Sequence, residues 1–255
     1  MSKRLKVFSF NLRVNTKNDG INSFDNRKGR VLECISNHKP DIIGFQEADG
    51  DMRAFLRDNL EDYTVVGCGR DKSYRGESAP IAFKKDEFEL ISLNTFWLSS
   101  KPNVPGSRYG FDQSRCPRVC TVARLHHVEC ESPFSFYNTH LDHEGKNARL
   151  LGAMQLMQHI SMQNEDIILT GDFNALPDSA EIKAITESTQ GLRDATALLD
   201  GTFHNYQRLT PHAKIDYIFT NAKCDESESF IIPDKAEDGI FISDHFPICA
   251  FVKID

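Results

Sequence analysis

A short apolar run in the second half of the chain ends in a turn that carries two polar side chains. Residues 167–169 (Ile-Ile-Leu) are typical of a buried strand, and Gly171 allows the backbone to turn after it. Because side chains alternate along an extended chain, Asp172 and Asn174 are predicted to face one side while Phe173 packs inward. A carboxylate beside a neutral amide suits the hydrolysis of phosphate esters, since one group can hold a cation or a water and the other can donate to an anionic oxygen.

Taken alone, a Gly-Asp-x-Asn turn is also typical of an ordinary loop, because Asp and Asn side chains accept hydrogen bonds from nearby backbone. Further apolar segments, however, are also predicted to end on polar residues. The segments 6–12, 42–45, 134–141, 214–219 and 241–247 carry or precede Asn11, Glu47, His140, Asp216, and Asp244 with His245. If two sheets pack with their corresponding edges aligned, these side chains converge and supply a metal ligand, a base and anion donors in one place.

The remaining segments complete a pattern of strands and amphipathic helices. Helical spacing predicts helices over 27–38, 51–60, 145–162 and 179–187, with Asp51 as the cap of the second. The core face of the third helix is predicted to hold Leu150, Met154, Met157 and Ile160. Further strands are predicted at 63–66, 81–83, 88–98, 119–125 and 248–252. Residues 99–118, rich in proline and glycine, are predicted to form a long loop, and loops of that length are often functional.

The charge of the chain limits the partners that it can bind tightly. Its 37 acidic residues exceed its 30 basic ones, which gives a net charge of −7 over 255 residues. A negative surface works against sequence-independent binding of long nucleic acid through many phosphate contacts, so a small substrate is favoured. The length suits one domain over residues 1–255, because β-rich folds of this size often share one core.

The N-terminal residues and the cysteines indicate a cellular location. The charged N-terminus passes directly into a predicted strand, without the apolar core of a signal peptide and without a run long enough to span a membrane. The cysteines are scattered and contain no C-x-x-C pair. We therefore expect a cytoplasmic protein, and the sequence implies neither a membrane nor a protein partner.

The polar strand ends, taken in order, resemble the endonuclease/exonuclease/phosphatase superfamily. That superfamily includes pancreatic deoxyribonuclease, apurinic endonucleases, inositol-phosphate phosphatases, neutral sphingomyelinases and the deadenylases. The resemblance covers nearly the whole chain and rests on Asn11, Gln46-Glu47, Asn138-Thr139-His140, Gly171-Asp172-Phe173-Asn174, Ile215-Asp216-Tyr217 and Ser243-Asp244-His245. It implies a deoxyribonuclease I-like four-layered α/β sandwich, in which two mixed β-sheets pack face to face with helices on the outside. It also implies a magnesium-dependent phosphoesterase site at one end of the sandwich.

Roles for these residues follow from the resemblance. Glu47 resembles the main magnesium ligand, with Asn11 close by and Asp244 as a further ligand; manganese is an alternative cation. His245 resembles the general base, oriented by Asp216, and Asp172 resembles the group that positions the attacking water. Asn174 and His140 resemble the donors to the phosphate. A site with few carboxylate ligands suits magnesium, because this ion keeps several waters.

A narrower resemblance indicates one branch of the superfamily. Apurinic endonucleases usually carry an acidic residue two positions after the first Asn, where this chain has Arg13. Three segments instead resemble a bacterial branch that contains sugar-phosphate phosphatases and is distantly related to the deadenylases. They are residues 96–99 with 105–107, residues 140–143 and residues 202–204. Within them, His143 and His204 are expected to contact substrate, and Arg118, at the end of the long loop, is expected to be an additional phosphate clamp.

Three hypotheses for the function therefore stay open. The first is a phosphatase that hydrolyses a small phosphomonoester, such as a sugar phosphate, by in-line attack of water. The second is a nuclease or an RNA-tail exonuclease, and the third is a non-catalytic binding domain on the same fold. The sequence retains every motif residue, which disfavours the third. Whether loop 99–118 closes over a small substrate or opens a groove decides between the first two.

Overall fold

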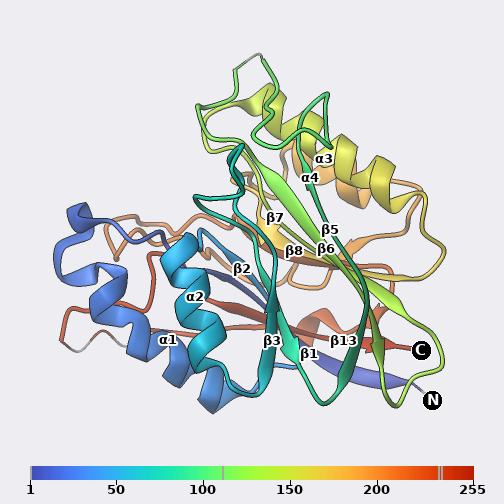
Figure 1. Ribbon diagram of the computed structural model, residues 1–255, viewed down its shortest axis with the longest axis horizontal. Coiled ribbons are helices and arrows are strands. Elements are labelled where there is room, and N and C mark those ends of the chain that lie inside the picture. Colours follow the sequence, from blue (N-terminus) through green and yellow to red (C-terminus); the bar gives the residue numbers. More distant parts are fainter. Residues whose placement is uncertain (1, 111, 235, 237) are drawn as a thin grey trace.

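Two mixed β-sheets pack face to face with helices on their outer faces, as predicted (Figure 1). The computed structural model describes residues 2–110, 112–234, 236 and 238–255. The seven-stranded first sheet contains, in spatial order, β11 (Lys223–Cys224), β13 (Ile248–Ile254), β1 (Lys3–Asn11), β2 (Ile42–Gln46), β4 (Ile81–Lys84) and β3 (Tyr63–Val66), with β12 (Phe230–Ile231) also paired to β13. The six-stranded second sheet contains β5 (Phe88–Trp97), β6 (Val119–His127), β7 (Phe134–His140), β8 (Asp166–Asp172), β10 (Asp216–Thr220) and β9 (Arg193–Asp194).

Helices cover the outer face of each sheet. Helices α1 (Phe24–His38) and α2 (Gly50–Asn59) lie on the first sheet, and α3 (Lys146–Ile160) and α4 (Ala180–Thr186) lie on the second (Figure 1). Short 3-10 turns, η1 (Lys17–Asn22) and η2 (Glu226–Glu228), lie in the connections. None of the helices in the described part of the chain is long and apolar enough to cross a membrane.

The inner faces of three strands, β1, β7 and β8, change from apolar to polar along their length. On β1, Leu5 and Val7 join the core between the sheets, and the next residues at the same spacing are Ser9 and Asn11. The even-numbered neighbours Phe8 and Phe10 instead pack against α1 and α2. The same change occurs along β7 (Phe134, Phe136, Asn138, His140) and along β8 (Ile168, Thr170, Asp172). One end of the inter-sheet space is therefore apolar, and the other end is lined by polar groups.

Strand direction brings these polar ends to the same edge. In the first sheet β1 runs parallel to β2, with Asn11 opposite Gln46. In the second sheet β7 runs parallel to β8, with His140 opposite Asp172. Because parallel strands end at the same edge of a sheet, each sheet contributes two polar carboxyl ends to one end of the sandwich.

A buried amide joins the two sheets just below this end. Asn138 donates to the carbonyl oxygens of Phe45 (2.6 Å) and Pro80 (2.9 Å), and its oxygen accepts from Gln46 (2.7 Å) and Thr170 (3.0 Å). All its hydrogen-bonding capacity is thus used inside the protein, as a buried polar group requires. The close approach depends on Gly44, where a Cβ atom would lie 2.1 Å from Thr170 Oγ1 and 2.6 Å from Asn138 Oδ1.

Most predicted elements are confirmed, with corrections at their ends. The first helix begins at Phe24, and the cap of α2 is Asp49, whose side chain accepts from the backbone N–H of Met52; the prediction of Asp51 as the cap was wrong. Met154 is 55% exposed and was wrongly predicted as core, because α3 buries a face that includes Ala153, Leu156, Met157 and Ile160. In the described part of loop 99–118, which omits residue 111, there is neither helix nor strand.

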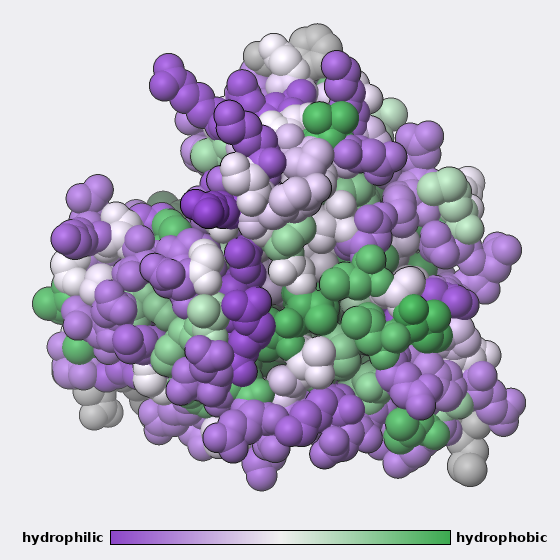
Figure 2. Space-filling model, viewed as in Figure 1, coloured by the Kyte–Doolittle hydropathy of each residue, from purple (hydrophilic) through white to green (hydrophobic). Residues whose placement is uncertain are grey.

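Apolar side chains are partly exposed along one side of the sandwich. Figure 2 shows green side chains gathered in the middle of this view, over the region where Figure 1 draws β3 and β5. The exposed large hydrophobic residues of β5 are Leu90, Ile91 and Leu93. Within the described chain β3 and β5 each pair on one flank only, so the core between the sheets ends there and these side chains meet solvent.

Replacing Gly44 by alanine is expected to destabilise the fold, because the new methyl group overlaps the buried side chains of Thr170 and Asn138. Overpacking of this kind costs about 1–3 kcal/mol. Gly29→Ala is a matched control, since Gly29 lies exposed in α1 with nothing within 4 Å of an added Cβ. Urea denaturation should show a lower free energy of unfolding for Gly44→Ala and an equal or higher value for Gly29→Ala. Equal stability of Gly44→Ala and the wild type would contradict the proposed role of this close approach.

Candidate active site

A cavity of about 280 Å³ opens at the polar end of the sandwich. Both sheets and the loops beyond them line it. The lining residues are Arg13, Val14, Glu47, Arg70, Glu77, Cys116, Arg118, His140, His143, Asp172, Asn174, Phe203, Ile215, Asp244 and His245. The structure thus brings together in one place Glu47, His140, Asp172, Asn174, Asp244, His245, Arg118 and His143, which the sequence had singled out.

Asn11 bridges one carboxylate from each sheet. Its amide nitrogen donates to Glu47 Oε1 (3.0 Å) and to Asp172 Oδ2 (2.9 Å), while its oxygen accepts from the backbone N–H of Arg13 (2.8 Å). The side chain is buried, so its hydrogen bonds are little weakened by water. In this arrangement Asn11 orients the two carboxylates, and its role as a cation ligand stays a prediction.

Two of the site residues that the sequence predicted adopt left-handed backbone conformations. Glu47 has φ 60° and Asn174 has φ 47°. Each is held locally by a carboxylate: Glu47 Oε2 accepts from Val14 N (2.9 Å), and Asp172 Oδ1 accepts from Asn174 N (2.9 Å). Such conformations cost energy for residues other than glycine and cluster at functional sites, where the surroundings maintain them. Both turns redirect the chain at a strand end so that the side chain enters the cavity.

His245 and Asp216 form a buried pair. His245 Nδ1 lies 2.8 Å from Asp216 Oδ2, which also accepts from the hydroxyl of Thr202 (2.6 Å). The far nitrogen, Nε2, lies 3.8 Å from Asp172 Oδ2 and 4.0 Å from Asp244 Oδ1. Burial alone would lower the pKa of His245, but Asp216, with Asp172 and Asp244, outweighs burial and raises it to about 10. The geometry fixes the ring with one nitrogen on Asp216 and the other toward the cavity.

His140 is held as a neutral ring. Asn174 donates from its amide nitrogen both to the carbonyl oxygen of Leu141 (3.1 Å) and to His140 Nε2 (3.0 Å). The contact with Leu141 identifies that atom as nitrogen, so His140 Nε2 must accept and the proton of the ring lies on Nδ1. Burial, with Arg118 and Arg70, lowers the pKa of His140 well below its usual value, which agrees with a neutral ring. Its Nδ1 is buried without a partner in the described structure.

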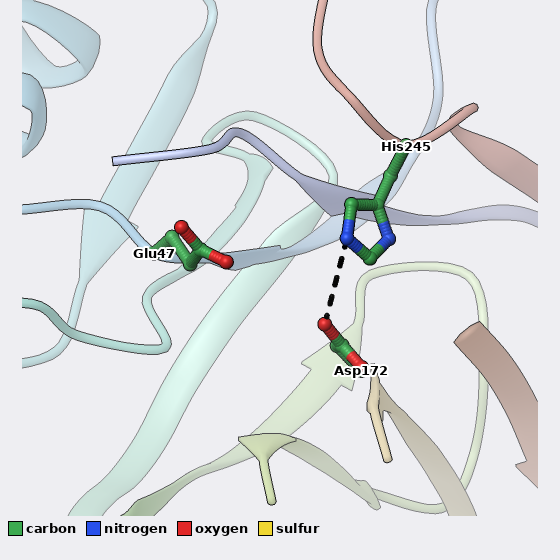
Figure 3. A group of neighbouring side chains, drawn as sticks. All are labelled: Glu47, Asp172 and His245. Carbon is green, nitrogen blue, oxygen red and sulfur yellow. Dashed lines mark ion pairs between the residues drawn. The ribbon is translucent and has the colours of Figure 1, made fainter. Parts of the chain in front are cut away.

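The carboxylates of the cavity fit a divalent cation. Glu47, Asp172 and His245 offer ligand atoms that all lie within 4.8 Å of one another, and Figure 3 shows the three side chains pointing toward one space. Burial and the charge of Asp216 raise the pKa of Asp172 to about 7, and burial, with Glu47, raises that of Asp244. The raised pKa values show that burial and neighbouring carboxylates outweigh the positive charges of Arg13 and His245, so a further positive charge would be favourable here, and oxygen donors suit magnesium or manganese.

Glu47 is the member of this group that stays ionised most readily. Burial would raise its pKa, but the backbone N–H of Val14, the charge of His245 and the amide of Asn11 together lower it. Glu47 would therefore be available to a cation near neutral pH, whereas Asp172 and Asp244 gain most from the positive charge that a cation brings.

Arg118, which is predicted to be an additional phosphate clamp, and the histidines His143 and His204 occupy different positions. Arg118 is buried beside Asp142 (3.4 Å) and His143 Nδ1 (2.7 Å), and its Nη1 has no partner in the described structure. Arg118 and His143 both line the cavity. His204 does not: it is fully buried, with its ring 4.1 Å from that of Phe246. The aromatic residue before it, Phe203, lines the cavity instead and contacts His245 with ring centroids 4.7 Å apart.

Three charged residues of the cavity, Arg13, Arg70 and Glu77, were not predicted from the sequence. Arg13 has φ 53° and is held by Asp19 through two hydrogen bonds (2.9 and 3.2 Å), with its Nε 3.8 Å from Asp244. Arg70 and Glu77 come from the loop between β3 and β4. The only sequence signal for Arg13 was its position two residues after Asn11. Arg70 and Glu77 had none beyond the charge of their loop, because their place depends on how that loop folds.

The chain is similar in sequence and in structure to proteins of one known family. A sequence profile of the endonuclease/exonuclease/phosphatase family matches residues 8–245. The chain is similar to a solved endonuclease/exonuclease/phosphatase from Bacteroides vulgatus, with 31% identity, a TM-score of 0.90, and 99% of this chain and 100% of that chain covered. It is also similar to the mannosyl-6-phosphatase of Bacteroides thetaiotaomicron VPI-5482, with 27% identity, a TM-score of 0.84, and coverages of 97% and 99%.

A more distant similarity concerns the fold alone. D. rerio TDP2 complexed with a single strand DNA product shares 17% identity, with a TM-score of 0.75 and coverages of 99% and 100%. The same sandwich therefore occurs in proteins that act on very different substrates, and the loops around the cavity must distinguish them.

Removing the charge of Asp216 is expected to lower the pKa of His245, because Asp216 is the main group that raises it. Asp216→Asn keeps the size of the side chain and an oxygen for Thr202. NMR titration of the histidine ring protons in cation-free protein measures the effect. The pKa of His38, which burial lowers, should not move, since its ring lies on α1 at the outer face of the first sheet. An unchanged pKa for His245 would show that Asp216 does not control its charge.

Proposed function

The chain belongs to the endonuclease/exonuclease/phosphatase family, and from that premise we propose that it is a divalent-cation-dependent phosphatase that hydrolyses a small phosphomonoester such as a sugar phosphate. The observation that supports a small substrate best is the size of the cavity around Glu47, Asp172 and His245. Its volume of about 280 Å³ is near the lower limit of ligand sites, which run from about 300 to 1,000 Å³. The net charge of −7 and the similarity to a mannosyl-6-phosphatase support the same choice.

Three carboxylates would hold the cation. Glu47 is the main ligand in this proposal and Asp244 is a further one that lines the same cavity. Asp172 offers a ligand atom within 4.8 Å of Glu47. Magnesium or manganese bound there would neutralise charge on the phosphate and act as a Lewis acid. Asn11 holds the carboxylates of Glu47 and Asp172 in place through its two hydrogen bonds.

The attacking water is oriented and deprotonated by groups on the second sheet and in the loop that precedes β13. Asp172 accepts a hydrogen bond from the water and orients it toward phosphorus, and His245 Nε2 takes its proton as general base. Asp216 holds the ring through Nδ1 and stabilises the charge that the ring gains. His245 must be neutral to act, and positive charge held by Glu47 and Asp244 would oppose its protonation and lower its pKa.

The phosphate is bound by donors at the ends of β7 and β8 and in the loop that precedes β6. Arg118 offers the unpartnered Nη1, and His140 has an unpartnered ring N–H. Asn174 already donates both amide hydrogens, to His140 and to Leu141, so it donates to the phosphate in this proposal by exchanging one of these contacts. A buried guanidinium is a strong donor to phosphate oxygens and remains charged throughout the reaction. The neutral ring of His140 can donate without competing for the proton that His245 accepts.

The substrate class is tested by phosphate release from sugar phosphates, nucleotides, inositol phosphates and short DNA or RNA, with magnesium and with excess chelator. We expect the sugar phosphates to react fastest, and only with the cation. Reaction in excess chelator would contradict cation dependence. Degradation of a polynucleotide without activity on sugar phosphates would instead favour the nuclease hypothesis.

His245 and Asp216 are expected to act as one unit in this reaction. General base catalysis contributes about a hundredfold to ten-thousandfold, so His245→Ala should lower kcat by that order. Because groups that act together are not additive, adding Asp216→Asn to His245→Ala should cost little more. Steady-state kinetics of both single variants and the double variant measures this. Losses that multiply in the double variant would show that the two residues act independently.

A further inference from the structure

The charged pair Arg70–Glu77 lies in the cavity but has no part in the proposed chemistry. Arg70 Nη2 lies 2.6 Å from Glu77 Oε1, and both residues line the cavity. Their side chains are 11% and 23% exposed, so the pair is largely withdrawn from solvent while still reaching the open space. A pair of this kind on an ordinary surface loop is usually well exposed and contributes little to stability.

The loop that carries the pair is fixed by its own hydrogen bonds. Arg70 N donates to Glu77 O (2.9 Å), so the two residues face each other at the neck of a small hairpin. Asp71 Oδ1 closes the hairpin by accepting from the backbone N–H groups of Ser73 (2.7 Å) and Arg75 (2.8 Å). The indole of Trp97 donates to Arg70 O (2.6 Å) and ties the hairpin to β5. The pair is therefore positioned before any ligand arrives, which reduces the entropy lost on binding.

The pair keeps unused hydrogen-bonding capacity. Its internal contact uses Arg70 Nη2 and Glu77 Oε1, and no hydrogen bond to another described residue occupies Arg70 Nε, Arg70 Nη1 or Glu77 Oε2. Donors and an acceptor thus lie side by side. A hydroxyl group donates one hydrogen bond and accepts others, so adjacent hydroxyls are matched by such a combination, whereas a phosphate, which only accepts, is not.

The position of the pair places it next to the groups that bind phosphate. A recess of about 10 Å³ beside the main cavity is lined by Arg70, Glu77, Arg118 and His140 together with residues 78, 79 and 119. His245 and Asp172 do not line this recess. The pair therefore lies beside Arg118 and His140, the predicted donors to the phosphate, where it can contact the remainder of a phosphorylated substrate.

We propose that Arg70 and Glu77 bind hydroxyl groups of the substrate and so select polyhydroxylated phosphomonoesters, that is, sugar phosphates, over phosphomonoesters that lack hydroxyls. This inference rests on the proposed function, since it assigns the specificity of the same site. Arg70 donates to substrate oxygens, and Glu77 accepts from substrate hydroxyls. Burial raises the pKa of Glu77, and the charge of Arg70 opposes this rise.

The test compares two substrates that share the phosphate but differ in hydroxyl groups. Mannose 6-phosphate carries several hydroxyls, and phenyl phosphate carries none. For the wild type, Glu77→Gln, Arg70→Lys and the control Glu129→Gln, kcat and KM are measured on both substrates with magnesium. Glu129 is a suitable control, because it is an exposed partner of Lys3 outside the cavity.

The expected result is a loss of preference. Hydrogen bonds to charged groups contribute about 1.5–3 kcal/mol, so the ratio of kcat/KM for mannose 6-phosphate to that for phenyl phosphate should fall about 10- to 100-fold in Glu77→Gln and in Arg70→Lys. Most of the change should appear in KM for the sugar phosphate, because the contact is made before the transition state as well as in it. Glu129→Gln should keep the wild-type ratio.

Other outcomes distinguish a failure of hydroxyl recognition by Arg70 and Glu77 from a failure of the proposed phosphatase function. If both substrates lose activity equally while the unfolding temperature stays at the wild-type value, the pair does not recognise hydroxyls. An unchanged ratio in both variants also overturns the inference. If Glu77→Gln unfolds, Arg70→Lys alone decides by the same ratio. A wild type that hydrolyses neither substrate overturns the proposed function itself, and the inference with it.

Discussion

The side chain of Asn11 donates to one carboxylate from each sheet, Glu47 and Asp172, and the site depends on this bridge. Glu47 follows β2 of the first sheet, and Asp172 ends β8 of the second sheet. The two carboxylates therefore meet only when the sheets pack together. Just below, Asn138 fixes the separation and register of the sheets by hydrogen bonds to β2 and β8. Because Asn11 and Asn138 each have hydrogen-bond partners on both sheets, a shift of one sheet would leave several buried groups unpaired, at a cost of about 1–3 kcal/mol each.

Packing at the apolar end of the sandwich stabilises a crowded arrangement at the polar end. Asp172, Asp216 and Asp244 surround His245, and burial of these carboxylates raises the pKa of Asp172 and Asp244. Such a cluster is unfavourable in the empty protein and becomes favourable when positive charge enters, which is the balance expected of a site built for a cation and an anionic substrate. The left-handed conformations at Glu47 and Asn174 are also energetically unfavourable and are maintained by the surrounding structure.

The sequence predicted the parts of the site that lie on regular structure. Alternation along β1, β7 and β8 places polar residues at the ends of apolar faces, so Asn11, His140 and Asp172 could be expected to converge once two sheets were assumed. Residues on loops were predicted less well. Arg70 and Glu77 reach the cavity through a hairpin whose form depends on contacts with Trp97, and His204 turned into the protein where Phe203 lines the cavity. The cap of α2 was also predicted at the wrong residue. Asp49 and Asp51 are equally suitable caps by residue type, and only the position where α2 begins distinguishes them.

In the proposed mechanism, carboxylates from both sheets form one cation site. Isothermal titration calorimetry of magnesium and manganese with the cation-free protein tests this without relying on turnover. Mutation of residues that support or form a metal site typically weakens affinity roughly 10- to 100-fold, so Glu47→Gln, from the first sheet, and Asp172→Asn, from the second, should each weaken binding by at least that order. Glu89→Gln on β5, an exposed carboxylate outside the cavity, should bind like the wild type. Equal affinity in the wild type, Glu47→Gln and Asp172→Asn would contradict the account.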